Sequence, residues 1–263
     1  MSHISFSEIK NWAECPWRHK LLYVDKLDVR SSNEYSAFGT AVHDTAEKVL
    51  QQGDNPDTEI FDPYRYFYTR FNQELIAGSL DINSELAEEM RPQVEGVFES
   101  LVPALDKYFE EKNGWELVDT EFELLQPIVE TDIKGYDFKG YIDLIVKDGD
   151  GHYHVIDWKT CTWGWNARKR SNTLLSRQLI YYKYYYAKAL GVDPRCISTH
   201  FGLIKRTAKK DKIEIFRVTS GERKTKNSLD FLDQALYNIT NKTCIKNRLS
   251  CLYCPFKNTE HCT

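Results

Sequence analysis

The sequence predicts an α/β protein with one core sheet, and three observations lead to this prediction. Over most of the first 113 residues, apolar positions recur at helical spacing. The pattern then becomes strand-like in three runs, at 115–130, 137–147 and 152–160. A long helical pattern follows, and two more strand-like runs come after it. A chain of 263 residues can bury a full core, so we expect a single domain over 1–263 with a helical insertion at about 54–113.

Two helices are predicted in the first 53 residues. In "SFSEIKNWAECPW", Ser5 and the glutamate three residues later form the signature of a helix N-terminus, and the apolar spacing continues to Cys15. In "FGTAVHDTAEKVLQQG", helical spacing ends at Gly53, a residue type that commonly terminates helices. This second helix carries His43.

The core sheet is predicted to start after residue 113. "DFKGYIDLIVK" and "HYHVIDWKT" are expected to form a hairpin across "DGDG". "TLLSRQLIYYKYYYAKALG" reads as a helix ending at Gly191. Two strands around a basic turn follow at 196–205 and 212–218, and a last helix is expected near 221–240.

The predicted hairpin carries the most informative group of polar residues. Asp143 precedes the turn and Asp157 follows it, so the two carboxylates can lie close together across the strand pair. Lys159 shares a strand face with Asp157 because the two are two residues apart. Two carboxylates form a site that Mg²⁺ favours when it also binds a phosphate substrate, and a lysine there can orient the attacking water. The D-x-K spacing alone is also common in surface ion pairs.

Composition limits the remaining possibilities. A net charge of −4 provides no general attraction for nucleic acid, so local basic patches must hold any polyanion. One such stretch contains Arg168, Lys169, Arg170 and Arg177, and it can also be an ordinary solvated surface. The sequence shows no secretory signal and no membrane-spanning run, from which we expect a cytoplasmic protein without membrane contact. In that compartment the seven cysteines favour metal binding or free thiols over disulfides.

Four motifs together resemble the RecB-type branch of the PD-(D/E)xK nuclease superfamily. They are "GTAVHD", "GYIDLIV", "VIDWKT" and "RQLIYY", and they occur in the family's order. The resemblance implies a restriction-endonuclease-like core, which is a mixed sheet flanked by helices, and Mg²⁺ or Mn²⁺ as cofactor. It implies metal ligation by His43, Asp143, Asp157 and the backbone carbonyl of Trp158, with Lys159 as the catalytic lysine. It further implies that Gln178 and Tyr182 face DNA, and it suggests Glu121 as a weaker additional acidic residue.

The end of the sequence, "CLYCPFKNTEHCT", raises the question of a second cofactor. It resembles the iron-sulfur type of this family, similar to AddB and CRISPR-adaptation nucleases, in which one early cysteine and three late ones hold a [4Fe-4S] cluster. This likeness implies Cys15, Cys251, Cys254 and Cys262 as ligands within a cluster-binding segment at about 244–263. Four thiolates also suit zinc. Cys244 is the alternative last ligand, while Cys161 and Cys196 are expected to be free thiols.

These observations predict a metal-dependent deoxyribonuclease, expected to be an exonuclease on single-stranded DNA or DNA ends. A nuclease that trims spacer precursors in CRISPR adaptation shares every motif used above and stays an alternative. A non-catalytic subunit that binds DNA ends is the alternative of another class. The chain has no GxxxxGK[ST] motif, so a helicase or recombination motor would have to be a separate partner protein.

Overall fold

The computed structural model describes residues 2–27, 33–53, 61–252 and 254–262. Within these residues, six strands form one sheet. The strands are β1 (Ser2–Ser5), β2 (Trp115–Pro127), β3 (Tyr136–Asp148), β4 (Tyr153–Cys161), β5 (Ile197–Lys205) and β6 (Ile213–Val218). The α-helices are α1 (Phe6–Glu14), α2 (Pro16–His19), α3 (Glu34–Gln52), α4 (Pro63–Ala77), α5 (Glu85–Met90), α6 (Leu101–Phe109), α7 (Ala167–Arg170), α8 (Thr173–Leu190) and α9 (Glu222–Thr240). A π-helix, η1 (Lys20–Val24), follows α2. The short 3-10 helices are η2 (Arg91–Val94), η3 (Phe98–Ser100), η4 (Glu110–Lys112), η5 (Pro194–Cys196) and η6 (Arg248–Ser250).

The sheet is mixed, as expected. β2 pairs antiparallel with β3, β3 with β4, and β5 with β6, whereas β1 is parallel to β3 and β4 is parallel to β5. Helix α8 lies between β4 and β5 in sequence and supplies the crossover that a parallel pair requires. The predicted hairpin between β3 and β4 is confirmed.

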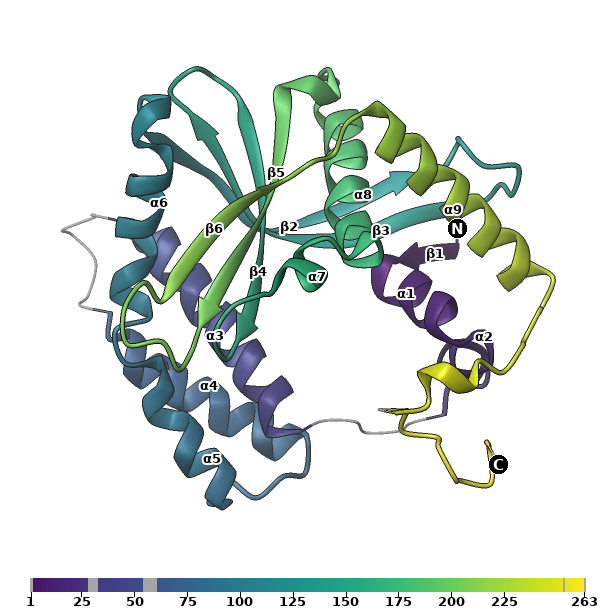
Figure 1. The fold of residues 1–263 in the computed structure, drawn as a ribbon, viewed down its shortest axis with the longest axis horizontal. Helices are drawn as coiled ribbons and strands as arrows, with labels where there is room; N and C mark the ends of the chain where they lie inside the picture. The colour runs from purple at the N-terminus through teal and green to yellow at the C-terminus, as the bar shows by residue number, and fades with distance from the viewer. Residues whose placement is uncertain (1, 28–32, 54–60, 253, 263) are drawn as a thin grey trace.

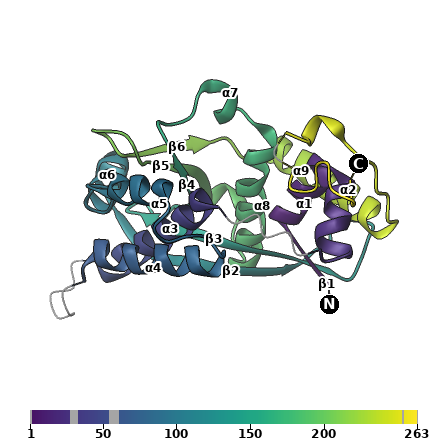
Figure 2. The ribbon, with the colours of Figure 1, turned by 90° about the horizontal axis from the view of Figure 1, so that it is seen from below.

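Helices cover both faces of the sheet (Figures 1 and 2). Alternate strand residues enter different cores, because neighbouring side chains on a strand point to opposite faces. Val155 of β4 packs in a core with α1, α8 and α9, whereas Ile156 and Trp158 pack in a second core with α3, α4 and α6. The part of the expected insertion that the structure describes, 61–113, contributes α4, α5 and α6 to this second core; its interpretation as an insertion stays a prediction.

Most sequence-based boundaries agree with the structure to within a few residues. Ser5 caps α1, and its side chain accepts a hydrogen bond from the Glu8 backbone N–H at 3.2 Å. Helix α3 begins earlier than predicted, because Asn33 and Ser36 form a reciprocal capping box. Strand β1 was not predicted. It is four residues long, and only its pairing with β3 makes it a strand.

Buried polar side chains form a hydrogen-bonded row near the hairpin turn. His154 lies 3.0 Å from the Asp148 carboxylate and 2.9 Å from His200, and His200 lies 3.0 Å from the Tyr108 hydroxyl. Burial, with smaller contributions from His154 and Arg217, lowers the pKa of His200 to about 3. The row therefore holds uncharged imidazoles at neutral pH.

Among the described helices, none has the length and apolar character needed to span a bilayer.

Candidate active site

The two carboxylates predicted from the hairpin lie at the point where the sheet divides. β2 runs along one edge of β3, while β1 and β4 share the other edge. On this shared edge β1 pairs with 136–139 and β4 pairs with 144–147, so 140–143 have no strand partner there among the described residues. Asp143 is the last residue of this gap. The backbone of Asp143 therefore has no ladder pairing with β1 or β4 among the described residues.

The strand register places Asp143 and Asp157 on the same face. Leu144 pairs with Ile156, and one further step along the hairpin brings Asp143 opposite Asp157. The Asp143 carboxylate accepts a hydrogen bond from the Trp158 backbone N–H at 2.7 Å. This bond fixes Asp143 against β4 and gives Trp158 a defined backbone role. The predicted role of the Trp158 carbonyl as a metal ligand stays a prediction.

Asp157 is a buried carboxylate with spare acceptor capacity. It is 1% exposed, and neither of its oxygens accepts a hydrogen bond of good geometry from the described residues. Its Oδ2 lies 2.6 Å from Lys159 Nζ in an ion pair. One lysine cannot neutralise both the buried Asp157 and the half-buried Asp143, so the arrangement suits an additional cation.

The electrostatics of the site agree with this reading. Burial raises the pKa of Asp143 well above its ordinary value, and the nearby Asp157 raises it further. Burial likewise raises the pKa of Asp157, which Lys159 partly offsets. Burial lowers the pKa of Lys159, but both carboxylates outweigh this effect and the pKa rises. Both carboxylates are thus costly to ionise as they stand, and a bound divalent cation would lower that cost.

His43 reaches the site from α3. Its Nδ1 lies 3.8 Å from the Asp143 Oδ2, and burial with the charge of Lys159 lowers its pKa to about 4. It is therefore neutral at pH 7 and able to bind a metal ion. The described part of the chain nevertheless contains no group of three or more His, Cys, Asp or Glu side chains already arranged to hold a metal ion. The donor types fit Mg²⁺ or Mn²⁺ if water and substrate oxygens complete the shell.

Glu121 lies on β2 across from Asp143, between the paired residues Thr120 and Phe122. It has a left-handed backbone conformation with φ of 48°. Burial raises its pKa, and Glu47 of α3 raises it further. Glu47 is itself held to β2, because it accepts a hydrogen bond from Thr120 Oγ1 at 3.3 Å. Sequence analysis did not single out Glu47, which follows His43 by four residues on α3, and its proximity to Glu121 was missed.

Gln178 and Tyr182 share a face of α8, as predicted from their spacing. Gln178 donates a hydrogen bond to the Tyr182 hydroxyl at 3.1 Å. The Tyr182 ring packs against Gly140 in the gap of β3, where a Cβ would lie 2.7 Å from the ring. Burial raises the pKa of Tyr182, and Asp157 raises it further. Tyr182 therefore supports the acidic site from α8, and the residue is only 5% exposed.

The basic residues after β4 point in different directions. Arg168 and Lys169 are exposed, whereas Arg170 forms an ion pair with Glu214 at 2.6 Å. The Arg177 guanidinium lies 3.6 Å from the centroid of the Phe231 ring on α9. The structure thus does not bring Arg170 and Arg177 together with Gln178 and Tyr182.

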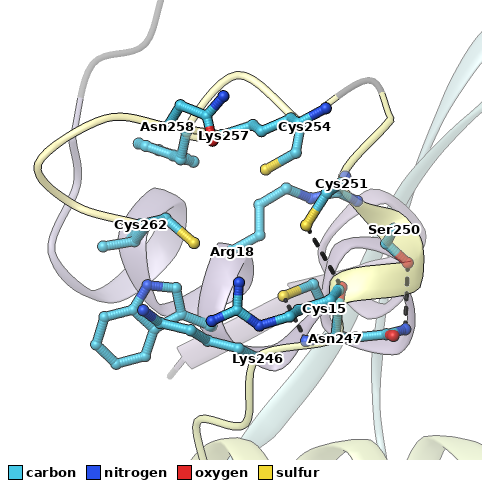
Figure 3. Close-up of a pocket in the computed structure, with 14 residues that line it drawn as sticks. Cys15, Arg18, Lys246, Asn247, Ser250, Cys251, Cys254, Lys257, Asn258 and Cys262 are labelled. Atoms are coloured by element: carbon cyan, nitrogen blue, oxygen red, sulfur yellow. Dashed lines mark hydrogen bonds between the residues drawn. The ribbon is translucent and has the colours of Figure 1, made fainter.

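The four cysteines implied as cluster ligands line one cavity of about 300 Å³, whereas Cys244 does not line it. Figure 3 shows Cys15, Cys251, Cys254 and Cys262 with the side chain of Arg18 among them. The two ends of the chain meet here, since Asn247 donates a hydrogen bond to the Glu14 carbonyl at 2.8 Å. All seven cysteines are free thiols, and the four around the cavity are not arranged as a ready metal site within the described residues.

A buried and a half-buried carboxylate with a lysine on adjacent strands are the equipment that metal-assisted hydrolysis of phosphate esters would need. Comparison with known families agrees, because the PD-(D/E)XK nuclease superfamily matches residues 3–259. The chain belongs to this superfamily, which indicates a metal-dependent hydrolytic nuclease; such nucleases typically use Mg²⁺ or Mn²⁺. No curated protein matches the chain. One solved structure, the crystal structure of SSO0001, is similar with a TM-score of 0.39 and 17% identity, over 83% of this chain and 94% of that one.

Proposed function

We propose that this chain is a deoxyribonuclease that degrades DNA from its ends and prefers single strands. The observation that carries the proposal is the buried Asp157 carboxylate, which has unused acceptor capacity beside Lys159 and opposite Asp143. Such a pair repels a phosphate unless a cation lies between them, so a protein that only binds DNA has no use for it.

The side chains suit distinct tasks in phosphodiester hydrolysis. Mg²⁺ or Mn²⁺, when bound, would neutralise charge on the scissile phosphate and acidify a water molecule. Asp157 and Asp143 would hold that ion, and the Trp158 N–H keeps Asp143 in place. Lys159 would orient the attacking water or stabilise the developing charge on the phosphate. His43, neutral at pH 7, would act as a further ligand.

The preference for single-stranded ends rests on the surface around α7. Exposed Arg168 and Lys169 precede α8. Trp163 of the same segment is 75% exposed, whereas Trp165 and Tyr182 are buried. An exposed indole can stack on an unpaired base, which contributes about 1 to 3 kcal/mol per base. Bases within a duplex cannot make this contact.

We also propose that Cys15, Cys251, Cys254 and Cys262 hold a [4Fe-4S] cluster, with zinc as the alternative, as in the nucleases of the AddB type. Support comes from the four thiols at a single cavity where the two ends of the chain meet. A cluster there would tie both ends together and limit their fraying. A helicase or recombination partner, and a cytoplasmic location, stay predictions.

The function is tested with end-labelled single- and double-stranded DNA in Mg²⁺, Mn²⁺ or EDTA. The proposal predicts metal-dependent release of short products from single-stranded ends. Covalently closed single-stranded circles serve as the control, and rapid cutting of circles would contradict the dependence on ends.

A further inference from the structure

A groove lined by basic residues lies on a different side of α8 from Gln178 and Tyr182. Its volume is about 590 Å³, and it is bounded by α7, the first half of α8, β6 and the start of α9. Four of its lining residues are cationic, and no aspartate or glutamate lines it; the cations are Arg170, Arg177, Arg217 and Lys224. In a protein with a net charge of −4, this is a local concentration of positive charge.

Three of these cations are available to a ligand. Only Arg170 forms an ion pair with a carboxylate among the described residues. Lys224 is exposed and donates only to the Thr219 hydroxyl at 2.5 Å. Arg217 is exposed at the edge of the sheet, where it also lines a neighbouring cavity beside His152 and His200. Arg177 is stacked on Phe231, and its Nε has no hydrogen-bond partner within the described chain. The groove therefore carries charge that the described part of the protein does not neutralise.

The groove is separate from the acidic site. It takes Ser176, Arg177 and Ile180 from α8, whereas Gln178 and Tyr182 do not line it. With 3.6 residues per turn, Arg177 and Ile180 lie on a different face of the helix from Tyr182. Arg170 of α7, which lines the groove, follows the last catalytic residue, Lys159, by only eleven positions in sequence. The two sites thus lie on different sides of one helix and are joined by a short segment.

The lining fits a phosphodiester backbone. Ser171, Thr173 and Asn227 add neutral hydrogen-bonding groups to the cations, and this combination is common at nucleic-acid phosphates and sugars. Ile180 and Phe216 provide apolar surface for a sugar or a base. The volume lies in the range of small-ligand sites, which suits a short piece of one strand.

We propose that this groove is an exosite that binds the backbone of a single DNA strand outside the catalytic centre. The identity of the polyanion rests on the proposed function. A strand held in the groove would stay attached to the enzyme while its end is cut at the acidic site.

Fluorescence anisotropy with labelled oligo(dT) of 6 and 30 nucleotides in EDTA tests the exosite, because no cleavage occurs there. The triple variant Arg177→Gln/Arg217→Gln/Lys224→Gln should weaken binding of the 30-mer at least tenfold at low salt. For this variant, the slope of log K against log salt should become less steep by about 2, because each of the three lost phosphate contacts to a single strand contributes about 0.7 to the slope. Unchanged 30-mer binding by this variant would overturn the exosite.

A charge-matched control separates the groove from a general charge effect. Arg65, Arg195 and Lys242 are exposed and do not line the groove. Their triple replacement by glutamine should leave 30-mer binding within about twofold of the parent; an equal loss in both triple variants would contradict a local site. The double variant Arg217→Gln/Lys224→Gln changes only exposed side chains and should retain most of the loss, which excludes misfolding as the cause.

Two further outcomes are distinguishable. Competition by inorganic phosphate as strong as that by an unlabelled oligonucleotide of equal phosphate content would show a small-anion site and overturn the strand assignment. The groove variants are also compared with the parent protein for cleavage in Mn²⁺. If the parent binds through the groove but cuts no DNA, the proposed function fails while the exosite stands. If the parent cuts and the triple variant binds like it, the exosite fails alone.

Discussion

Gly202 on β5 lies opposite Trp158 of β4, and the strand pairing depends on its lack of a side chain. A Cβ at Gly202 would lie 2.2 Å from two carbons of the Trp158 indole. Carbon atoms in contact are about 3.5 to 4.0 Å apart, so the Gly202→Ala variant must displace the ring by more than about 1 Å. Trp158 is 2% exposed and fully surrounded, and it separates the two catalytic residues of β4. Displacing the Trp158 ring therefore lowers the stability of the fold and also shifts Asp157 and Lys159 on either side of it.

The expected cost is about 3 kcal/mol of unfolding free energy, at the upper end of the range for overpacked cores. Urea unfolding followed by circular dichroism measures it. The matched control is Gly39→Ala within α3, where an added Cβ has no neighbour within 4 Å. This variant should gain about 0.5 to 1 kcal/mol, because glycine is unfavourable inside a helix. A Gly202→Ala protein as stable as the parent would refute the packing argument.

Three further predictions concern the pH response, the cysteines and the basic stretch. The pKa of His200 is about 3 in the folded protein and about 6.5 when unfolded, so only the unfolded chain gains a proton as the pH falls below 6.5. The stabilising contribution of His200 is therefore present above pH 6.5 and is lost as the pH falls toward 3, at about 1.4 kcal/mol per unit; His200→Gln should flatten the fall in urea midpoint between pH 6.5 and 5, and an equally steep fall would contradict this. Anaerobically purified protein should be brown with about four irons per chain, and Cys15→Ala should remove the colour and lower Tm; colour that survives the substitution would exclude Cys15 as a ligand. Replacing Arg168, Lys169 and Arg170 with alanine should raise KM for DNA while kcat changes little; steady-state kinetics with the parent's KM would mean that these residues are solvated surface only.

The strands and helices that hold the acidic site were predictable because their signals are local. The alternation of apolar residues along β3 and β4, with "DGDG" between them, determines the hairpin and its register. The register in turn brings Asp143 and Asp157 to one face. Lys159 follows from the period of two along a strand.

Other features depend on contacts between distant segments and left no local signal. β1 is a strand only because it meets β3, and the division of the sheet at Asp143 follows from β1 and β4 sharing one edge. The left-handed conformation of Glu121 has no signature in its neighbours. Likewise, the direction of the Arg177 side chain is set by Phe231, more than fifty residues later. The spacing of apolar residues therefore predicted which side chains share a face of a strand or helix, but not which strands and helices pack against each other.

The central claim is that Asp143, Asp157 and Lys159 form a metal-dependent catalytic site. The most direct measurement is single-turnover cleavage of end-labelled single-stranded DNA by the parent, Asp157→Asn and Lys159→Ala, in Mn²⁺ and in EDTA. We predict cleavage by the parent in Mn²⁺ only, a loss of at least about a thousandfold in both variants, and urea midpoints close to or above that of the parent. Cleavage by either variant at a rate near that of the parent would contradict it.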